Sequence, residues 1–281
     1  MKKILRSIFL VFSISVVAAI LGMVISGKNS AELTISILRS IKNLRGSESL
    51  RFDELNEETE PAVHEQWDIL LKKYVNTDGN VDYKGFKTDS VLLDSYLEEL
   101  SGHPPGINWS EAEKKAYWIN TYNAFTIKLI LDYYPVTSIK EIAGSVPFIN
   151  SPWDIKFFKI GDNLTDLNTI EHEILRKKFN DPRIHFAINC ASVSCPNLRN
   201  EAYNASRLDM QLNEQAIEFI NDATKNNVSG SSVKLSMVFY WFQGDFEIDS
   251  TLLTYLNQFA TVQADEDASI EYLEYDWALN E

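Results

Sequence analysis

The residues best suited to chemistry lie in one short stretch, HFAINCASVSCPNLRNEAY, which covers residues 185–203. It holds His185 and the chain's only two cysteines, Cys190 and Cys195. A thiol beside an imidazole can act as a nucleophile with its base, or can bind a soft metal. The stretch therefore predicts a functional site at this point of the chain, with Cys190 as the candidate nucleophile.

Two further candidates, Glu171 and His172, lie just upstream in TIEHEILRKKF. We expect this segment to be a helix, and a carboxylate in a first helical turn is often only a favourable charge near the N-terminus. Either His172 or His185 could serve as the base for Cys190, and Glu171 completes the candidate catalytic group. Each residue also has a structural interpretation, because a free cysteine or a buried histidine is often only part of the packing.

A zinc site is the metal alternative, because two histidines and two cysteines can complete a tetrahedron. The spacing of these residues is not the usual paired spacing of zinc ligands, so we expect neither a metal nor another cofactor. Cys190 and Cys195 are close enough in sequence to be joined by a disulfide, and they could equally be free thiols.

Two asparagines in the segment WINTYNAF, Asn120 and Asn123, occupy a predicted helix although asparagine is a poor choice for a helix interior. They are three residues apart and share one face, which indicates buried hydrogen bonds to a loop. We therefore expect the candidate site to pack against this helix, with both asparagines as binding or scaffolding residues.

Apolar spacing and turn signals indicate alternating helices and short strands. Helices are predicted over residues 63–75, 88–100, 169–179, 206–224 and 251–259, and a longer one between a capping box at Ser110 and Glu113 and a stop at Pro135. Strands are predicted over 155–160, 184–188, 233–235 and 270–275, and the turn at Gly161, Asp162 and Asn163 after the first strand indicates a hairpin. No repeat or βαβ rhythm is present, so we predict one α+β domain with helices packed around a small, mainly antiparallel sheet.

Residues 1–27 have the pattern of a membrane anchor or a signal segment. Lys2, Lys3 and Arg6 precede an apolar run over 8–25, about 18 residues long, which is near the minimum for a spanning helix. No Ala-x-Ala site follows the run, which favours an uncleaved transmembrane anchor over a cleaved signal. The positive residues predict that the rest of the chain faces the periplasm or the cell exterior, and cleavage would make the protein secreted.

The remaining chain divides into an amphipathic stalk and acidic linker, 28–61, and a globular domain, 62–281. The hydrophobic content of 45% is sufficient for a sizeable core. The net charge of −14 argues against nucleic acid as a partner, because phosphates would be repelled.

Four segments together resemble the family called domain of unknown function 547: AYWINTYNAFTIKLI, LNTIEHEILRKKFNDPRIHFAINCASVSCPNLRNEAY, LSMVFYWFQGDF and YDWALN. The family is uncharacterised, so the resemblance implies no activity. The positions that match its pattern are Asn120, Asn123, Glu171, His172, His185, Cys190, Cys195, Asp276 and Asn280. The resemblance places Asp276 among the candidate binding residues, beside Asn120, Asn123 and Cys195.

Two functions remain open from the sequence. The first is a membrane-anchored, envelope-facing hydrolase or acyltransferase with a cysteine-histidine site. The second is a non-catalytic binding or structural domain, in which the same cluster is a buried polar network or a ligand site. The geometry distinguishes them, because a catalytic site needs the Cys190 sulfur within hydrogen-bond reach of an imidazole in an open cleft.

Overall fold

A computed structural model of the chain describes residues 57–143 and 151–281. The predicted anchor or signal segment, 1–27, and most of the predicted stalk and linker lie outside the described residues. Within the described ranges, no helix is long and apolar enough to cross a membrane.

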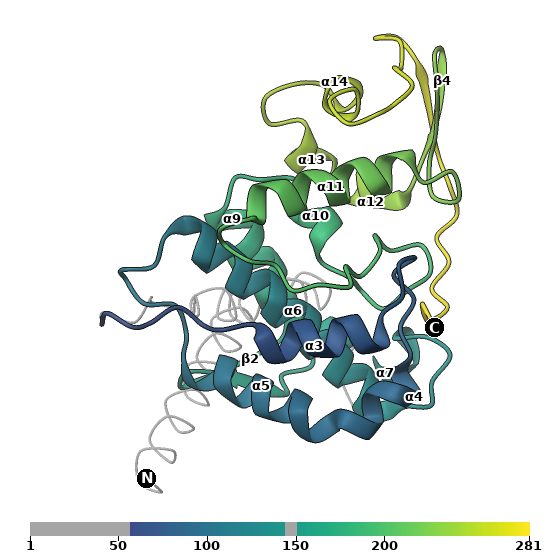
Figure 1. Cartoon of the computed structure of the whole chain (residues 1–281). Coiled ribbons are helices and arrows are strands. Elements are labelled where there is room, and N and C mark those ends of the chain that lie inside the picture. Colours follow the sequence, from purple (N-terminus) through teal and green to yellow (C-terminus); the bar gives the residue numbers. More distant parts are fainter. Residues whose placement is uncertain (1–56, 144–150) are drawn as a thin grey trace, which may run out of the picture. The chain divides into compact units, whose positions relative to one another are not determined.

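The N-terminal part of the described domain consists of helices, in which α3 contacts α4 and α5, and α5 contacts α6 (Figure 1). Their bounds are α3 (Glu65–Tyr74), α4 (Tyr83–Phe86), the 3-10 turn η1 (Lys87–Asp89), α5 (Ser90–Gly102), α6 (Glu111–Tyr133) and α7 (Lys140–Ala143). The helices predicted over 63–75 and 88–100, and the long helix that ends before Pro135, are confirmed within two or three residues at each end.

The long helix α6 is the central element of this part. Its predicted capping box is present, since the Ser110 hydroxyl accepts the N–H of Glu113 and the Glu113 carboxylate accepts the N–H of Ser110. α4, α5 and the helical segment after β2 all pack against α6, so most of its side chains are buried. Polar side chains on such a helix must find partners inside the domain, which is the situation of Asn120 and Asn123.

The rest of the chain alternates short helices with short strands. The bounds are η2 (Pro152–Asp154), β1 (Phe158–Ile160), β2 (Asn163–Thr165), α8 (Leu167–Thr169), the π-helical turn η3 (Ile170–Leu175), α9 (Arg176–Lys178), α10 (Ile184–Ala187), α11 (Leu208–Asn221), β3 (Asn227–Ser229), β4 (Ser232–Leu235), α12 (Met237–Trp241), α13 (Gln243–Phe246), α14 (Leu252–Leu256) and β5 (Ser269–Tyr272). The described ranges therefore form a mixed domain of helices and small sheets, as predicted.

One predicted strand is wrong. Residues 184–187 of this predicted strand form the short helix α10, in which the N–H groups of His185 and Phe186 bond to carbonyls three residues earlier, at Pro182 and Arg183. Proline at the start of a turn is compatible with a helix, since its missing N–H is not needed there. The apolar run alone could not distinguish a buried helical turn from a buried strand.

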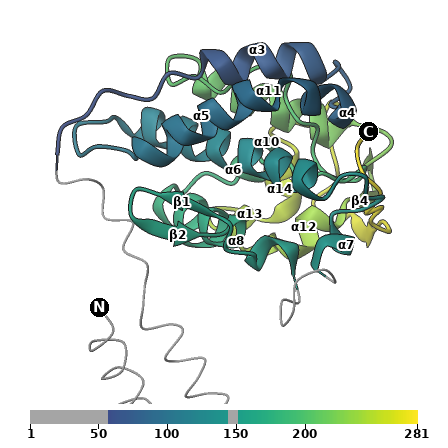
Figure 2. The ribbon, with the colours of Figure 1, turned by 90° about the horizontal axis from the view of Figure 1, so that it is seen from below.

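The single sheet that we predicted is instead two small sheets. β1 and β2 form the expected antiparallel hairpin around Gly161 and Asp162, and β1 lies against α5 (Figure 2). In the second sheet, β4 lies between β3 and β5, antiparallel to the first and parallel to the second. The long excursion from β4 to β5 contains α12, α13 and α14, which permits the parallel pairing.

The second sheet, α11 and α12–α14 share an aromatic core. Phe186 from α10 is fully buried there and packs against Phe219 of α11, Phe239 of α12 and Phe246 of α13. Burying a large apolar side chain stabilises a fold by roughly 2–3 kcal/mol, so these rings fix the position of α10. The neighbouring residue His185 is thereby held in place.

The C-terminal tail returns from β5 to the N-terminal helices, as the yellow trace in Figure 1 shows. The Asn280 carbonyl accepts the N–H of Val81 at 2.7 Å, and its side-chain oxygen accepts the Tyr83 hydroxyl, also at 2.7 Å. The tail therefore connects parts of the domain that are far apart in the sequence.

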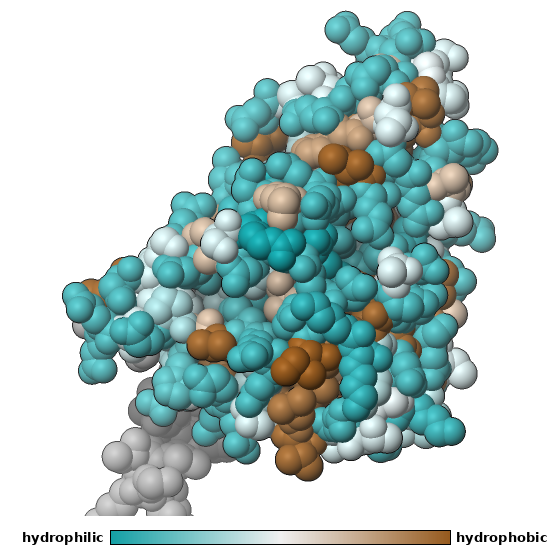
Figure 3. Space-filling view, in the orientation of Figure 1, coloured by the Kyte–Doolittle hydropathy of each residue, from teal (hydrophilic) through white to brown (hydrophobic). Residues whose placement is uncertain are grey.

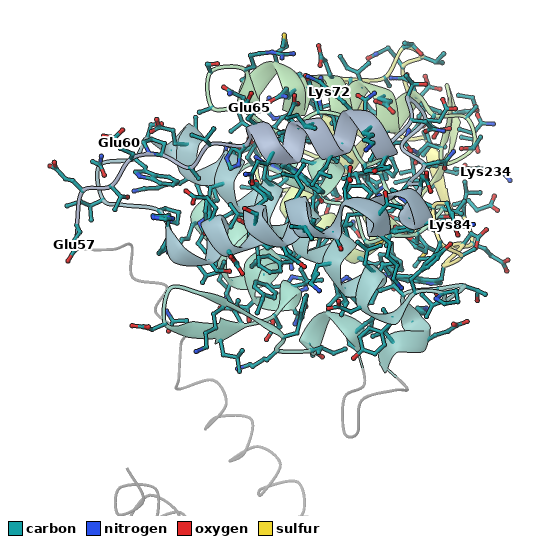
Figure 4. All side chains as sticks on the ribbon, turned by 60° about the horizontal axis from the view of Figure 1, so that its bottom comes forward. Glu57, Glu60, Glu65, Lys72, Lys84 and Lys234 are labelled. Atoms are coloured by element: carbon teal, nitrogen blue, oxygen red, sulfur yellow. The ribbon has the colours of Figure 1, made fainter. Side chains whose placement is uncertain are left out.

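The surface is mostly polar. On the face in Figure 3, hydrophobic residues form small, separate groups in a largely hydrophilic surface. Charged side chains such as Glu65 and Lys72 on α3, and Lys84 on α4, lie on the outside (Figure 4). The candidate thiol, carboxyl and imidazole side chains lie inside the domain, between α6, η3 and the loop after α10.

Candidate functional site

Glu171 and His172 lie on the π-helical turn η3, within the continuous helical segment that starts at α8. Asp166 caps this segment by accepting the N–H of Thr169 at 2.7 Å. Glu171 is therefore in the interior of the segment rather than in its first turn, and its side chain is buried. π-Helical turns are rare and are frequent at functional sites, because the extra residue redirects the side chains.

The loop after α10 carries both cysteines, and asparagine side chains fix its backbone. Asn123 of α6 donates to the Ala187 carbonyl at 2.9 Å and accepts the N–H of Asn189, also at 2.9 Å. Asn189 in turn donates to the Pro196 carbonyl and accepts the N–H of Ala191, both at 2.8 Å. The loop is thus closed on itself and attached to the long helix, as we expected for Asn123.

The turn that presents Cys190 includes an uncommon backbone conformation. Ala191 has a φ of 59°, in the left-handed region that residues with a Cβ rarely adopt. Such a conformation persists only where the surroundings enforce it, and it is found preferentially at functional positions. The Asn189 side chain helps to enforce it, because it accepts the N–H of Ala191 and donates to the Pro196 carbonyl further along the loop.

The Cys190 thiol is surrounded by hydroxyl and sulfur groups. Its sulfur lies 3.0 Å from the Ser192 hydroxyl and 3.1 Å from the Tyr275 hydroxyl, and these two hydroxyls are 2.9 Å apart. The Cys195 sulfur accepts the backbone N–H of Cys190 at 2.9 Å. Both cysteines are free thiols, so the disulfide alternative is not present in this structure.

The electrostatics of the thiol and the carboxyl are linked. Burial raises the pKa of Cys190, but hydrogen bonds from Cys195, Ser192 and Tyr275 outweigh burial and lower the pKa to about 7. Burial also raises the pKa of Glu171 to about 7, and the nearby Cys190 charge contributes to this rise. Because the two charges repel, ionisation of Cys190 makes ionisation of Glu171 less favourable.

The two imidazoles belong to a separate, charged group of side chains. His185 donates from Nε2 to the Asp245 carboxylate at 2.7 Å, and Arg176 holds the same carboxylate with two bonds, of 2.5 and 2.9 Å. Arg176 also donates to Nδ1 of His172 at 2.8 Å. Burial lowers the pKa of both histidines, so both are neutral at neutral pH.

His185 has one unusual feature. Its ring is buried, and its Nδ1 has no hydrogen-bond partner among the described residues. With the Nε2 proton donated to Asp245, Nδ1 is an acceptor whose lone pair is unused. A buried polar atom without a partner is uncommon in proteins and indicates a place where a bound molecule could complete the bonding.

Both groups face one cavity of about 180 Å³. Its walls come from α6, η2, η3, α10, α12 and the C-terminal tail. The residues that line it are Tyr122, Ser151, Trp153, Asn168, Glu171, His172, His185, Ile188, Cys190, Cys195, Pro196, Val238, Trp241, Phe242, Tyr275 and Trp277. All four candidate catalytic residues therefore line the same cavity, although no hydrogen bond joins Cys190 to an imidazole among the described side chains.

The candidate binding residues divide into two groups. Asn123 and Cys195 support the loop after α10 that carries Cys190, which we call the thiol loop. Asn120 instead bonds to both backbone groups of Tyr203, away from the cavity lining. Asp276 is exposed, and its carboxylate accepts the N–H of Ala278 in a local turn. Neither Asn120 nor Asp276 lines the cavity, so the structure brings together only part of the predicted set.

Several residues at the site were not identified from the sequence. Tyr275, Ser192, Arg176 and Asp245 contact the candidate groups directly, and Tyr122 donates to Glu171 at 3.3 Å. Asp245 and Tyr275 lie in or next to segments that carry the family resemblance, which was a usable signal. Their roles were not visible, because 60 residues separate His185 from Asp245 and 85 separate Cys190 from Tyr275.

The described residues include no group of three or more histidine, cysteine, aspartate or glutamate side chains that could hold a metal ion. The thiols and imidazoles line the same cavity without forming such a group. The zinc alternative therefore has no donor set within the ranges that the structure covers.

Fold and site together define a mixed helix-and-sheet domain with a thiol-containing cavity. Residues 107–220 match the model of the family described as "Protein of unknown function, DUF547", which confirms the family predicted from the sequence. The matched region includes α6, η3, α10 and the thiol loop, whereas Asp245 and Tyr275 lie beyond it. No curated protein and no solved structure is significantly similar to the chain.

Proposed function

We propose that the domain is a thiol-dependent hydrolase or acyltransferase, with Cys190 as its nucleophile. The observation that carries the proposal is the convergence on one cavity of the Cys190 thiol, the buried Glu171 carboxyl and two neutral imidazoles. The thiolate is the reactive form of cysteine, and a pKa of about 7 keeps much of Cys190 in that form at neutral pH. Ser192 and Tyr275 stabilise the thiolate by donating to it.

The proposed reaction proceeds through a thioester. The Cys190 sulfur attacks an acyl carbon, a sulfur–carbon bond forms, and the bond from that carbon to the leaving group breaks. The leaving group takes a proton from Glu171, whose pKa of about 7 leaves it partly protonated. Water or an acceptor alcohol or amine then attacks the thioester, returns the proton to Glu171 and releases Cys190.

The histidines support this reaction from the other side of the cavity. Asp245 orients His185, and the unpartnered Nδ1 is an acceptor that can hold the incoming water or acceptor by a hydrogen bond. The arrangement differs from a dyad in which an imidazole binds the thiol directly, because the Cys190 partners are hydroxyls. Glu171 therefore carries the proton in both steps, and His185 positions the incoming group.

The test is to trap the acyl-enzyme. The purified chain is mixed with p-nitrophenyl hexanoate at pH 7.5, quenched in acid and analysed by peptide mass spectrometry. We expect one hexanoyl group on Cys190 and none in Cys190→Ser. In Cys195→Ser, which keeps the nucleophile and removes one hydrogen-bond partner of its loop, the label should still be on Cys190. A native protein in which Cys190 takes up neither hexanoyl groups nor iodoacetamide would contradict the proposal.

A non-catalytic ligand-binding domain is the second candidate, and one observation favours it. The Cys190 sulfur already has two hydroxyl partners and no imidazole partner in the described part of the chain. In that case the cavity would hold a ligand without reacting with it. A ligand that protects Cys190 from alkylation and is recovered unchanged would support this candidate.

We also propose that residues 1–27 anchor the chain in a membrane, with the domain facing the periplasm or cell exterior. The support is the apolar run after three basic residues. The full chain should remain with membranes after alkaline carbonate extraction, and a fragment that starts near residue 57 should be soluble. A mature N-terminus near Lys28 would identify a cleaved signal instead.

We propose that the domain has no nucleic-acid partner, and retention of DNA by the fragment would contradict this.

A further inference from the structure

The size of the cavity limits what can reach Cys190. The cavity measures about 180 Å³. An apolar cavity of about 150 Å³ holds one benzene molecule, so this one has room for roughly seven carbon atoms. That is the size of a short acyl group, and the rest of a long lipid chain would have to extend beyond the space beside the thiol.

The lining of the cavity is mainly apolar. Ile188, Val238 and Phe242 contribute aliphatic and aromatic surface beside the thiol. The carboxyl of Glu171 is the acidic group on this wall, and it is buried, with the Tyr122 hydroxyl as its partner. An acyl group with its own negative charge would have to lose its water shell next to this carboxyl, which is unfavourable.

The rim of the cavity is a connected set of aromatic rings. Trp277 contacts Trp153 at 5.8 Å, Trp241 at 5.7 Å and Tyr275 at 4.4 Å between ring centroids. Lys140 adds its ammonium group 3.7 Å above the Trp277 ring. The rings come from η2, α12 and the C-terminal tail and pack against one another. A longer acyl chain would have to separate these ring contacts to enter.

We propose that the cavity selects a short, uncharged acyl group of about four to eight carbon atoms as the part of the substrate that becomes attached to Cys190. This inference rests on the proposed thiol chemistry and adds the substrate class to it. The aromatic rim sets the upper limit on chain length, and the mainly apolar lining excludes anionic acyl groups because they would lose their water shell there.

The experiment is a series of p-nitrophenyl esters, in which the rate of acyl-Cys190 formation is measured by quench and mass spectrometry. The acyl groups are acetyl, butyryl, hexanoyl, octanoyl and dodecanoyl, with the anionic succinyl group for comparison. Each methylene that enters the cavity should raise the second-order rate roughly four-fold. We expect a maximum between butyryl and octanoyl, and rates at least ten-fold lower for dodecanoyl and succinyl.

Two variants locate the length limit. Trp241→Ala removes part of the rim and should move the maximum to longer chains, because the ring is half-exposed at the cavity wall. Tyr240→Ala is the matched control, since Tyr240 is an exposed neighbouring ring outside the lining, and it should leave the series unchanged. The wild-type series is decisive by itself if the first variant does not fold.

The outcomes separate the inference from the function beneath it. Acyl-Cys190 that forms at equal rates along the series, or fastest with dodecanoyl or succinyl, overturns the substrate class and leaves the thiol chemistry intact. Absence of acyl-Cys190 with every ester, from a folded protein, overturns both.

Discussion

The two sides of the cavity are held in place by different forces. On the thiol side, Cys190 is positioned by neutral groups, the hydroxyls of Ser192 and Tyr275, in a loop that asparagine side chains fix to α6. On the imidazole side, the histidines are positioned by the Arg176–Asp245 ion pair. The thiol side thus depends on buried hydrogen bonds, and the imidazole side on charge.

This difference has consequences for chemistry. Neutral donors can lower the pKa of a thiol without placing a permanent positive charge beside it, so the cavity stays apolar enough for an uncharged ligand. The ion pair, in contrast, fixes the direction of the His185 ring while burial keeps the ring neutral. The following changes should break one side of the cavity while leaving the other intact.

The largest effect should come from Asn123→Ala on the thiol side. The change leaves the Ala187 carbonyl and the Asn189 N–H buried without partners, which should lower the free energy of unfolding by about 4 kcal/mol. Chemical denaturation measures the loss. Asn180→Ala is the control at an exposed asparagine and should change stability by less than about 0.5 kcal/mol. A loss of similar size in both variants would show that the Asn123 hydrogen bonds to the loop do not stabilise the fold more than a surface asparagine does.

A pH-dependent effect of about 3 kcal/mol is expected for Glu171→Gln. The folded-state pKa of Glu171, about 7, is above the ordinary value of 4.5, so its stabilising effect is complete below pH 4.5 and is lost as the pH rises through 7. The variant lacks this loss, and its stability relative to the wild type should increase between pH 4.5 and pH 8. Denaturation of both proteins at several pH values provides the measurement. A constant difference across this range would refute the raised pKa.

On the imidazole side, Asp245→Asn should lower the free energy of unfolding by about 2 kcal/mol, because Arg176 and His185 lose a charged partner in a partly buried place. The pKa of His185 should fall further, since Asp245 raises it in the wild type. Thermal denaturation and NMR titration of the ring would report both effects. Asp249→Asn, at an exposed neighbouring position, is the control and should have little effect. Equal effects from the two substitutions would argue against the ion pair as the organising element.

The smallest effect on stability should come from Tyr275→Phe, which removes one hydroxyl shared by Cys190 and Ser192. We expect a loss of about 1 kcal/mol, together with an upward shift of the pH midpoint for alkylation of Cys190, because the thiolate loses a donor. Iodoacetamide rates between pH 5 and 10 test the shift. Tyr240→Phe on the exposed surface is the matched control. An unchanged midpoint in Tyr275→Phe would remove Tyr275 from the account of the thiol.

The sequence by itself determined the longer helices, the hairpin and the segments where chemistry is concentrated. Local rules were sufficient for these features: the Ser110–Glu113 capping box depends on residues three apart, and the burial of Trp67 and Leu71 on α3 follows from helical spacing. The same local rules failed at His185, where an apolar run was compatible with both a strand and a helical turn.

Only the tertiary structure decided which groups meet. Asp245 and Tyr275 reach the site through packing of α13 and through the return of the C-terminal tail, and no local pattern encodes either approach. For the same reason, Asn120 bonds to the distant Tyr203 and Asp276 to the nearby Ala278, both away from the cavity, although they match the family pattern as well as Asn123 does. A pKa depends on burial and on partners from distant elements, so the acidity of Cys190 and Glu171 became visible only when the chain was folded.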